Sequence, residues 1–124
     1  MPGKLGLTET QYMIMSYFWK ENCELTVNMV QAHFSGCGYQ WAVQTVQTFL
    51  ENLVKKKALS IKRQGHQKKY YPSMDRLSYA AYWMKNMISE NFDNGLDDFA
   101  VALSSFKNEL NDEQKKELEK IWNE

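Results

Sequence analysis

The sequence has few of the residues that cross-link small proteins, and it has no long apolar segment. Only two cysteines, Cys23 and Cys37, occur in 124 residues. They cannot form a disulfide framework, which favours a reducing location. No apolar run approaches the roughly 18 residues that a membrane span requires, and the N-terminus lacks the apolar region of a secretory signal. We therefore expect a cytoplasmic protein without membrane insertion.

Motifs that carry enzyme chemistry are also missing. Neither His33 nor His66 has a partner at the spacing of a metal site or a catalytic triad. No HExxH, GxSxG, P-loop or CxxC pattern occurs. We therefore expect no catalytic residues, no metal site and no cofactor, and we predict that the protein is not an enzyme.

The charge of the chain is zero overall but unevenly divided. Fifteen basic residues balance fifteen acidic ones, while apolar residues reach 44%, too many for a disordered chain. Residues 1–72 hold nine basic and four acidic side chains, net +5, and residues 73–124 hold six and eleven, net −5. Such asymmetry is typical of nucleic-acid or membrane contact by one half. The alternative is a solvated basic surface, which charge alone slightly favours.

Two helices, the second of them short, are predicted near the N-terminus. Thr8 and Gln11 can form a capping box at the start of a helix that ends near residues 20–22. Leu25 begins a short extended piece, and Thr26 can cap a second helix from Val27 to about residue 34. Two glycines within residues 35–38 then predict a loop.

A third helix and a hairpin follow. From Trp41 to Lys57 the apolar period is 3.6, and the stripe is Val43, Val46, Phe49, Leu50, Leu53 and Val54. Residues 59–62 alternate with period 2, residues 64–67 make a turn, and a second strand closes at Pro72, which predicts a hairpin with basic side chains at its tip. This order of elements is typical of a winged helix-turn-helix.

After Pro72 the pattern predicts helices only. Ser73 or Asp75 can cap a helix that runs to about Asn91, and two further helices follow, the last one capped by Asn111. A segment of this size cannot bury its many aromatic side chains alone. We therefore predict a mainly α (α+β) fold, with a winged-helix domain at 1–72 and a helical dimerisation region at 73–124. The interface candidates, each of which could instead be internal core, are Tyr79, Trp83, Met87, Phe99, Leu103, Phe106, Leu118 and Trp122.

The polar face of the third helix suggests contact with double-stranded DNA. Its first two turns carry glutamine and threonine rather than charged residues, and in a helix-turn-helix this half meets base edges. Glutamine can bond adenine, and threonine can contact thymine or phosphate. The base-contact candidates are Gln44, Thr45, Gln47 and Thr48. The candidates for backbone contact, some of which could merely be solvated, are Trp41, Lys55, Lys62, Arg63, His66, Lys68 and Lys69.

Several fragments together resemble the penicillinase-repressor family (BlaI/MecI/CopY type). The resemblance covers residues 7–72 well and the remainder loosely, through Leu7-Thr8, Ile14-Met15, Phe18-Trp19, Trp41-Ala42, Thr45-Val46, Thr48, Leu50, Leu53, Lys55-Lys56, Gly65 and Tyr70-Tyr71-Pro72. It implies a homodimeric repressor on pseudo-palindromic operators with TACA/TGTA-like half-sites. The base-reading helix would be Trp41 to Lys57 and the wing Lys62 to Lys68, and a sensor-protease partner is possible.

The sequence departs from that family at several positions. Asn52 replaces a common arginine, and Lys57 replaces a glycine. A side chain in a left-handed conformation costs roughly 1 kcal/mol, so we expect a differently built helix end there. The Asn-Phe bond cleaved in antibiotic-responsive members is missing from the middle arm helix, and Asn91-Phe92 lies elsewhere. The C-terminal cysteine cluster of copper-responsive members is missing too, which leaves the inducing signal open.

Two other functions are compatible with the sequence. A winged helix can serve as a protein-interaction module, in which case its DNA affinity would be that of any basic patch. A redox sensor acting through Cys23 or Cys37 is a more distant alternative.

Overall fold

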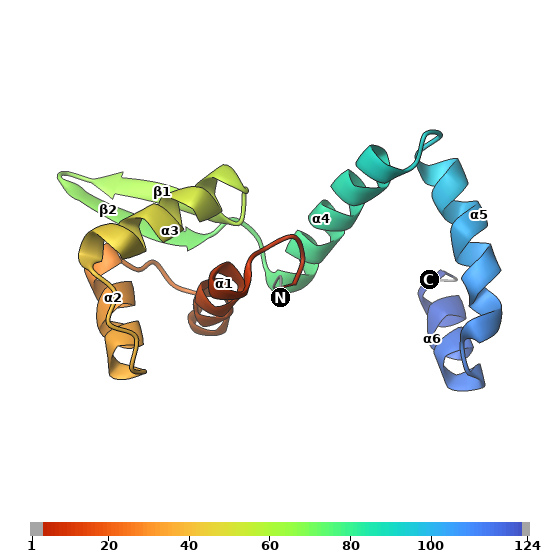
Figure 1. The fold of residues 1–124 in the computed structure, drawn as a ribbon, viewed down its shortest axis with the longest axis horizontal. Coiled ribbons are helices and arrows are strands. Elements are labelled where there is room, and N and C mark those ends of the chain that lie inside the picture. Colours follow the sequence, from red (N-terminus) through yellow and green to blue (C-terminus); the bar gives the residue numbers. More distant parts are fainter. Residues whose placement is uncertain (1–3, 123–124) are drawn as a thin grey trace. The chain divides into compact units, whose positions relative to one another are not determined.

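The computed structural model describes residues 4–122, with side chains up to residue 120. The chain divides into two compact units, Met1–Trp83 and Met84–Glu124 (Figure 1). Helix α4 (Arg76–Asn91) contributes residues to both units. The domain boundary at Pro72 stays a prediction, because the first turns of α4 group with the hairpin and helices before it.

The first unit is a winged helix, as predicted. It contains α1 (Glu9–Glu21), α2 (Val27–Gly36), α3 (Val43–Lys55), β1 (Leu59–Gln64) and β2 (Gln67–Pro72). The two strands pair antiparallel and lie beside α3 (Figure 1). Among the described residues the chain is mainly helical, which confirms the predicted fold class.

The predicted caps at the starts of α1, α2 and α4 are confirmed. The backbone N–H of Gln11 donates to Thr8 Oγ1 over 3.1 Å, and the N–H of Thr8 donates to Gln11 Oε1 over 2.9 Å. Thr26 Oγ1 accepts from the N–H of Met29. Asp75 Oδ1 accepts from the N–H of Ser78 at the start of α4, and this hydrogen bond lowers the pKa of the Asp75 carboxyl. Short polar side chains here satisfy amides that the helix itself leaves free.

The core of the first unit lies between the three helices and the hairpin. Leu25 pairs with Tyr70 through backbone hydrogen bonds of 2.8 Å in both directions, so the segment before α2 acts as a minimal third strand. The fully buried apolar side chains include Leu7, Ile14, Met15, Phe18, Val30, Phe34, Val46, Leu50, Leu53, Leu59 and Tyr70. Burial of this set is the main source of stability for the unit.

Helix α3 is shorter than predicted and buries a narrower stripe. It begins after Ala42, whose backbone is extended at ψ 153°, so Trp41 precedes the helix. Val43, predicted to be in the core, is instead 43% exposed, because it is the first residue of the helix. Phe49 and Val54 are partly buried against the core. The prediction that Val43 belongs to the buried stripe is therefore wrong.

The hairpin turns in two residues. Gly65 has φ +61°, a conformation that the first position of a tight hairpin turn requires and that glycine adopts without strain. The register pairs Ile61 with Tyr70. It also brings like charges together, with Lys62 opposite Lys69 and Arg63 opposite Lys68.

The first turns of α4 pack on the first unit. Trp19 Nε1 donates to the carbonyl of Met74, and the Tyr79 ring lies 6.1 Å from that of Trp19. Gly6 has φ +75°, and a Cβ placed there would lie 2.6 Å from Trp83 Nε1. A residue without a side chain is therefore needed at Gly6 to let the Trp83 ring approach.

The second unit consists of helices. After α4 come α5 (Leu96–Phe106), a short 3-10 turn η1 (Lys107–Glu109) and α6 (Asp112–Trp122). The predicted cap is confirmed, since Asn111 Oδ1 accepts from the N–H of Gln114 over 2.7 Å. No side chain of α5 is fully buried. No helix in residues 4–122 is long and apolar enough to cross a bilayer.

Helix α3 ends in a motif that normally contains glycine. The N–H of Lys57 donates to the carbonyl of Val54 and that of Ala58 to the carbonyl of Leu53, each over 3.0 Å. These two bonds form a Schellman motif, and Lys57 occupies its left-handed position with φ +68°. The expectation of a differently built helix end is therefore wrong, because the backbone keeps the glycine geometry and the lysine carries the strain.

Replacing Lys57 with glycine should raise the free energy of unfolding by about 1 kcal/mol, since the left-handed strain disappears. Urea denaturation of Lys57→Gly and Lys57→Ala would measure the change in the free energy of unfolding. Alanine keeps a Cβ and should not stabilise. Equal stability of all three proteins would contradict the strained helix end.

Candidate nucleic-acid interface

The polar face of α3 stays on the surface of the first unit. Gln44, Thr45 and Thr48 are exposed, and Gln47 is half-buried. The Thr48 hydroxyl donates to the carbonyl of Gln44 over 3.1 Å. This bond holds the Thr48 side chain in one rotamer, with its methyl group still available to a partner. The four base-contact candidates thus lie on one uncharged surface.

Glu51 adds a carboxylate to this face, one turn beyond Gln47. Gln47 Nε2 donates to Glu51 Oε1 over 3.1 Å. Glu51 is not among the site residues predicted from the sequence. Its i, i+4 spacing from Gln47 was the signal that could have revealed the pair.

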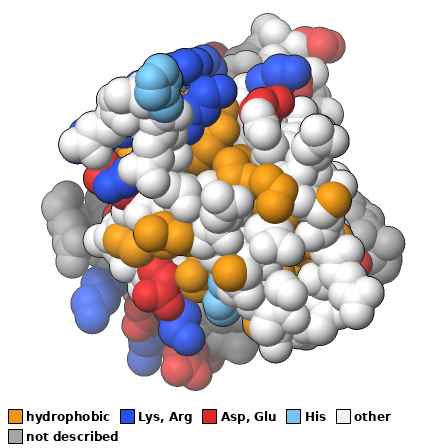
Figure 2. Space-filling view, turned by 90° about the vertical axis from the view of Figure 1, so that its left-hand side faces the viewer, with side chains coloured by type: hydrophobic (Ala, Val, Ile, Leu, Met, Phe, Trp, Pro, Cys, Tyr) orange, Lys and Arg blue, Asp and Glu red, His pale blue; other side chains and the backbone are white. Residues whose placement is uncertain are grey.

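The hairpin presents the basic side chains next to α3. Lys62, Arg63 and His66 are exposed, while Lys68 and Lys69 are half-buried. Figure 2 shows Lys and Arg side chains grouped near a histidine at one edge of this face. Like charges directly opposite each other on a hairpin are destabilising. Among the described residues only Lys62 has an ion pair, with Nζ 3.5 Å from Glu24 Oε2 and both side chains exposed, and such a pair contributes little.

A polar cleft of about 270 Å³ joins α3, the hairpin tip and the start of α2. Gln47 borders it from α3, and His66 and Lys68 border it from the hairpin. Tyr70 lies behind it, and within the described part of the chain its buried hydroxyl has no hydrogen-bond partner. Burial, followed by the nearby Glu51 carboxylate, raises the pKa of Tyr70, with a smaller opposing effect of Arg63. The helix face and the wing therefore form one continuous polar surface.

Comparisons with known proteins identify this arrangement. The family model described as penicillinase repressor matches residues 7–124. The chain belongs to the penicillinase repressor family. The solution structure of the DNA-binding domain of the repressor BlaI is similar at 28% identity and TM-score 0.50, over 61% of this chain and 90% of that one. A mutant of Staphylococcus aureus MepR bound to an oligodeoxyribonucleotide shares the fold at 17% identity and TM-score 0.52, over 97% of this chain and 78% of that one. Curated proteins gave no match.

Membership of the penicillinase repressor family confirms the resemblance seen in the sequence. It makes the chain a transcriptional regulator with a winged-helix, DNA-binding architecture. Which residues contact DNA stays a prediction.

Trp41 has structural partners within the first unit. Its ring centroid lies 5.3 Å from that of Phe34, 4.9 Å from that of Tyr39 and 5.2 Å from that of Phe49. Gln31 Nε2 donates to the carbonyl of Trp41. These contacts fix the turn that leads from α2 into α3, whether or not the ring also touches a DNA backbone.

The three lysines at the end of α3 have different environments. Lys55, a predicted backbone contact, is exposed. Lys56 Nζ instead donates to Gln11 Oε1 over 2.7 Å and to the carbonyl of Gly6 over 3.1 Å. Lys56 therefore ties the end of α3 to the start of α1, a role that no local sequence pattern indicates.

The two cysteines are exposed. Cys37 Sγ lies 3.9 Å from His33 Nε2, and the His33 ring stacks on Tyr17 with centroids 3.7 Å apart. Burial, more than the neighbouring acidic groups, raises the pKa of Tyr17. Within the part of the chain that the structure describes, no group of three or more His, Cys, Asp and Glu residues could hold a metal ion.

The interface candidates separate into two groups. Tyr79 is only 4% exposed, and its hydroxyl donates to the carbonyl of Lys56, so its burial is explained within one chain. Trp83 lies against Gly6 in the same unit. The Trp122 side chain lies outside the described residues. In the second unit the candidates Met87, Phe99 and Leu118 are half-buried.

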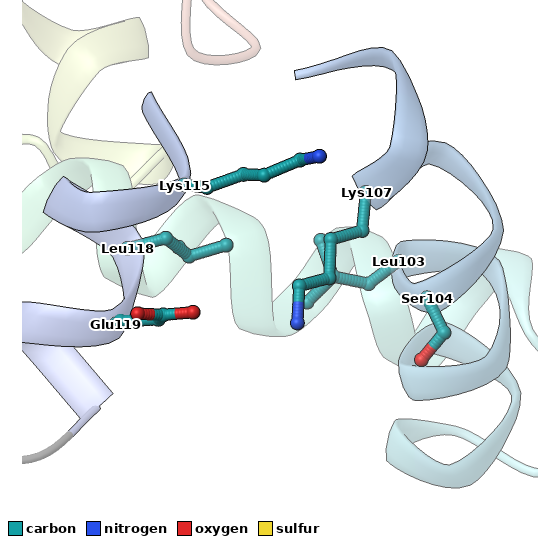
Figure 3. Close-up of a pocket in the computed structure, with 6 residues that line it drawn as sticks. All are labelled: Leu103, Ser104, Lys107, Lys115, Leu118 and Glu119. Atoms are coloured by element: carbon teal, nitrogen blue, oxygen red, sulfur yellow. The ribbon is translucent and has the colours of Figure 1, made fainter. Parts of the chain in front are cut away.

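A groove of about 440 Å³ runs between α5 and α6 in the second unit. Its apolar lining residues are Leu103, Phe106, Leu110 and Leu118. Figure 3 shows a neighbouring pocket. In it, Lys115, Leu118 and Glu119 of α6 face Leu103 of α5 and Lys107 of η1. Phe106 is 44% exposed, and Leu96 and Val101 on α5 are 70% and 67% exposed. Among its described residues, this unit therefore leaves a large apolar area without a partner.

Substituting Lys56 should weaken the fold, whereas substituting Lys55 should not. Lys56→Ala removes two hydrogen bonds from a charged donor, and we expect a loss of about 1–3 kcal/mol in the free energy of unfolding. Lys55→Ala removes the same charge from an exposed position and should change it by less than about 0.5 kcal/mol. Chemical denaturation of both variants provides the comparison, and an equal effect would contradict the structural role of Lys56.

Proposed function

We propose that the protein is a sequence-specific repressor that binds a pseudo-palindromic operator as a homodimer in the cytoplasm. The observation that carries this proposal is the exposed glutamine and threonine face of α3 beside a basic hairpin, in a member of the penicillinase repressor family. A short uncharged polar face is suited to base edges, and the adjacent cations are suited to phosphates.

Sequence recognition is assigned to four residues of α3. Each glutamine can hold adenine through its amide, which accepts from N6 and donates to N7. Each threonine offers a methyl group to thymine or a hydroxyl to phosphate. Support comes from the burial of the opposite side of α3, which fixes the orientation of the residues concerned, namely Gln44, Thr45, Gln47 and Thr48.

Affinity is assigned mainly to the wing. Phosphates placed between its cations would relieve the two like-charge pairs, Lys62 with Lys69 and Arg63 with Lys68. His66 occupies the turn and Lys55 the end of α3, both exposed. Each cation that neutralises a phosphate releases counterions, so binding should weaken steeply as salt rises.

Dimerisation is assigned to the second unit. The apolar side chains of α5 and α6 remain partly exposed in one chain, and a second copy would cover them by the same surface. Tyr79 and Trp83 already have partners in the first unit. The proposed interface therefore consists of Met87, Phe99, Leu103, Phe106 and Leu118. Two recognition helices on a two-fold axis would meet half-sites about one helical turn apart.

A sensor-protease partner would require a different cleavage site. Helix α5 reads LDDFAVALSSF and contains no Asn-Phe bond. Asn91 and Phe92 stand at the end of α4. If proteolysis inactivates this repressor, we infer that cleavage occurs at another bond than the one in antibiotic-responsive members.

Removing the two glutamines should abolish sequence preference. We expect Gln44→Ala with Gln47→Ala to lower affinity for the promoter region of the protein's own gene at least tenfold, because each bidentate contact contributes about 1–3 kcal/mol. Binding to random duplex should remain and stay salt-sensitive. Gel shift against both duplexes measures the ratio.

The matched control replaces two exposed amides of the second unit, Asn86→Ala with Asn108→Ala, and should leave the ratio unchanged. A wild-type protein that prefers its promoter no more than random duplex would instead support the protein-interaction module.

Dimerisation can be tested by placing one charged side chain in the proposed interface. Leu103→Asp should give monomers in light scattering at micromolar concentration, because a carboxylate in an apolar interface has no partner. Ser105→Asp puts the same charge on the opposite side of α5 and should leave the dimer intact. A wild-type protein that is monomeric under these conditions refutes the assignment.

A further inference from the structure

The exposed acid on α3 has no evident role in a helix that meets DNA. Glu51 lies one turn beyond the glutamine and threonine face, where a carboxylate would repel phosphates. Within the described residues the ion pair found is that of Glu24 with Lys62, so no cation pairs with Glu51. Its partner is the Gln47 amide.

We propose that Glu51 is a positioning residue that orients the amide of Gln47 to read adenine and to reject guanine. The proposal rests on the proposed function, since it requires that α3 meets base edges. It adds a residue that touches no base and yet determines which base its neighbour accepts.

The hydrogen bond between the two side chains restricts the amide of Gln47. Nε2 donates one of its two hydrogens to Glu51 Oε1 over 3.1 Å. Rotating the amide by 180° would turn its carbonyl oxygen toward the carboxylate, where two acceptors repel. The held amide therefore offers one free N–H and one free carbonyl oxygen to any further partner.

These two remaining groups match adenine. In the major groove adenine presents the acceptor N7 next to the donor N6, and guanine presents the two acceptors N7 and O6. A free glutamine could give both hydrogens of Nε2 to guanine. Held by Glu51, Gln47 has a single hydrogen left, and its oxygen would face guanine O6. The pair thus discriminates between the two purines.

The backbone beneath the pair is fixed by burial. Leu50 and Leu53, which flank Glu51, are fully buried, as is Val46 beside Gln47. The Glu51 carboxylate also lies close enough to Tyr70, a buried residue of β2, to contribute to the raised pKa of that hydroxyl. Pre-organisation requires a rigid helix beneath both side chains, since a mobile helix would not hold the Gln47 amide at one angle.

The test compares full-length variants in selection from a random duplex library. Gln47→Ala identifies the base pair that Gln47 reads, as the position where it loses preference. At that position Glu51→Ala should lower the adenine-to-guanine ratio by about threefold or more, because the amide is released. Glu51→Gln can accept from Nε2 or donate to the carbonyl oxygen of Gln47, so it no longer selects one orientation of the amide, and the ratio should fall as well.

The effect of the Glu51 charge on affinity for DNA of any sequence is measured separately. Both Glu51 variants should bind random duplex more tightly than the wild type, since each removes a negative charge. Asn52→Ala, at the neighbouring exposed position, should change neither quantity. In a Gln47→Ala background, Glu51→Ala should no longer affect the purine preference, because the amide it orients is missing.

Several results would overturn the inference while leaving the proposed function intact. The first is a wild-type preference that Glu51→Ala does not change. The second is an effect of Glu51→Ala on the purine ratio that persists in the Gln47→Ala background, which would make charge rather than amide orientation the cause. A preference for cytosine that disappears with Glu51 would indicate direct contact, and a Gln47→Ala protein that keeps all preferences would show that Gln47 reads no base. A wild type without any preference refutes the proposed function, and this inference with it.

Discussion

The burial of one side of α3 is the constraint on which the rest of the structure depends. Val46, Leu50 and Leu53 are fully buried among α1, α2 and the hairpin. Because an α-helix turns 100° per residue, fixing this stripe also fixes which side chains face outward. The uncharged face of Gln44 and Thr48 is therefore a consequence of the core. A helix that was free to roll could not present the same side chains in every molecule.

The elements predicted from the sequence are those set by local chemistry. The Thr8 capping box, the Thr26 cap and the hairpin depend on residues within a few positions of each other, and all three are present. Features that depend on distant partners were missed. Lys56 is one of three consecutive lysines in the sequence, and only the folded chain brings Gln11 to it, 45 positions away. Val43 fits the apolar period of α3, yet it remains 43% exposed at the first position of the helix.

Lys57 illustrates a different limit. The local preference against a left-handed lysine is about 1 kcal/mol, and it correctly predicts strain. It fails to predict the outcome, because the two hydrogen bonds to Val54 and Leu53 and the burial of Ala58 and Leu59 act together at this helix end. Their sum exceeds the cost at one residue. Backbone strain is tolerated where the surrounding structure determines the conformation.

Apolar periodicity leaves open which surface a side chain packs against. Tyr79 and Phe106 both fit the helical pattern of the acidic half, yet Tyr79 is buried in the first unit and Phe106 remains 44% exposed. A stripe facing its own core and a stripe facing another chain have the same period. The sequence could therefore predict that the candidate interface consists of apolar side chains. It could not predict which of these side chains pack within their own chain and which remain exposed.

The basic charge lies where it does not stabilise the fold. Lys62 opposes Lys69, and Arg63 opposes Lys68, across a two-stranded hairpin that has few interactions to spare. Selection for stability alone would place opposite charges in these pairs. Lys56, in contrast, donates to two acceptors of its own chain. Charges that oppose folding agree with our proposal that the wing meets the phosphates of a duplex. The net charge of zero conceals this, because it adds the cations of the wing to the acids of a different unit.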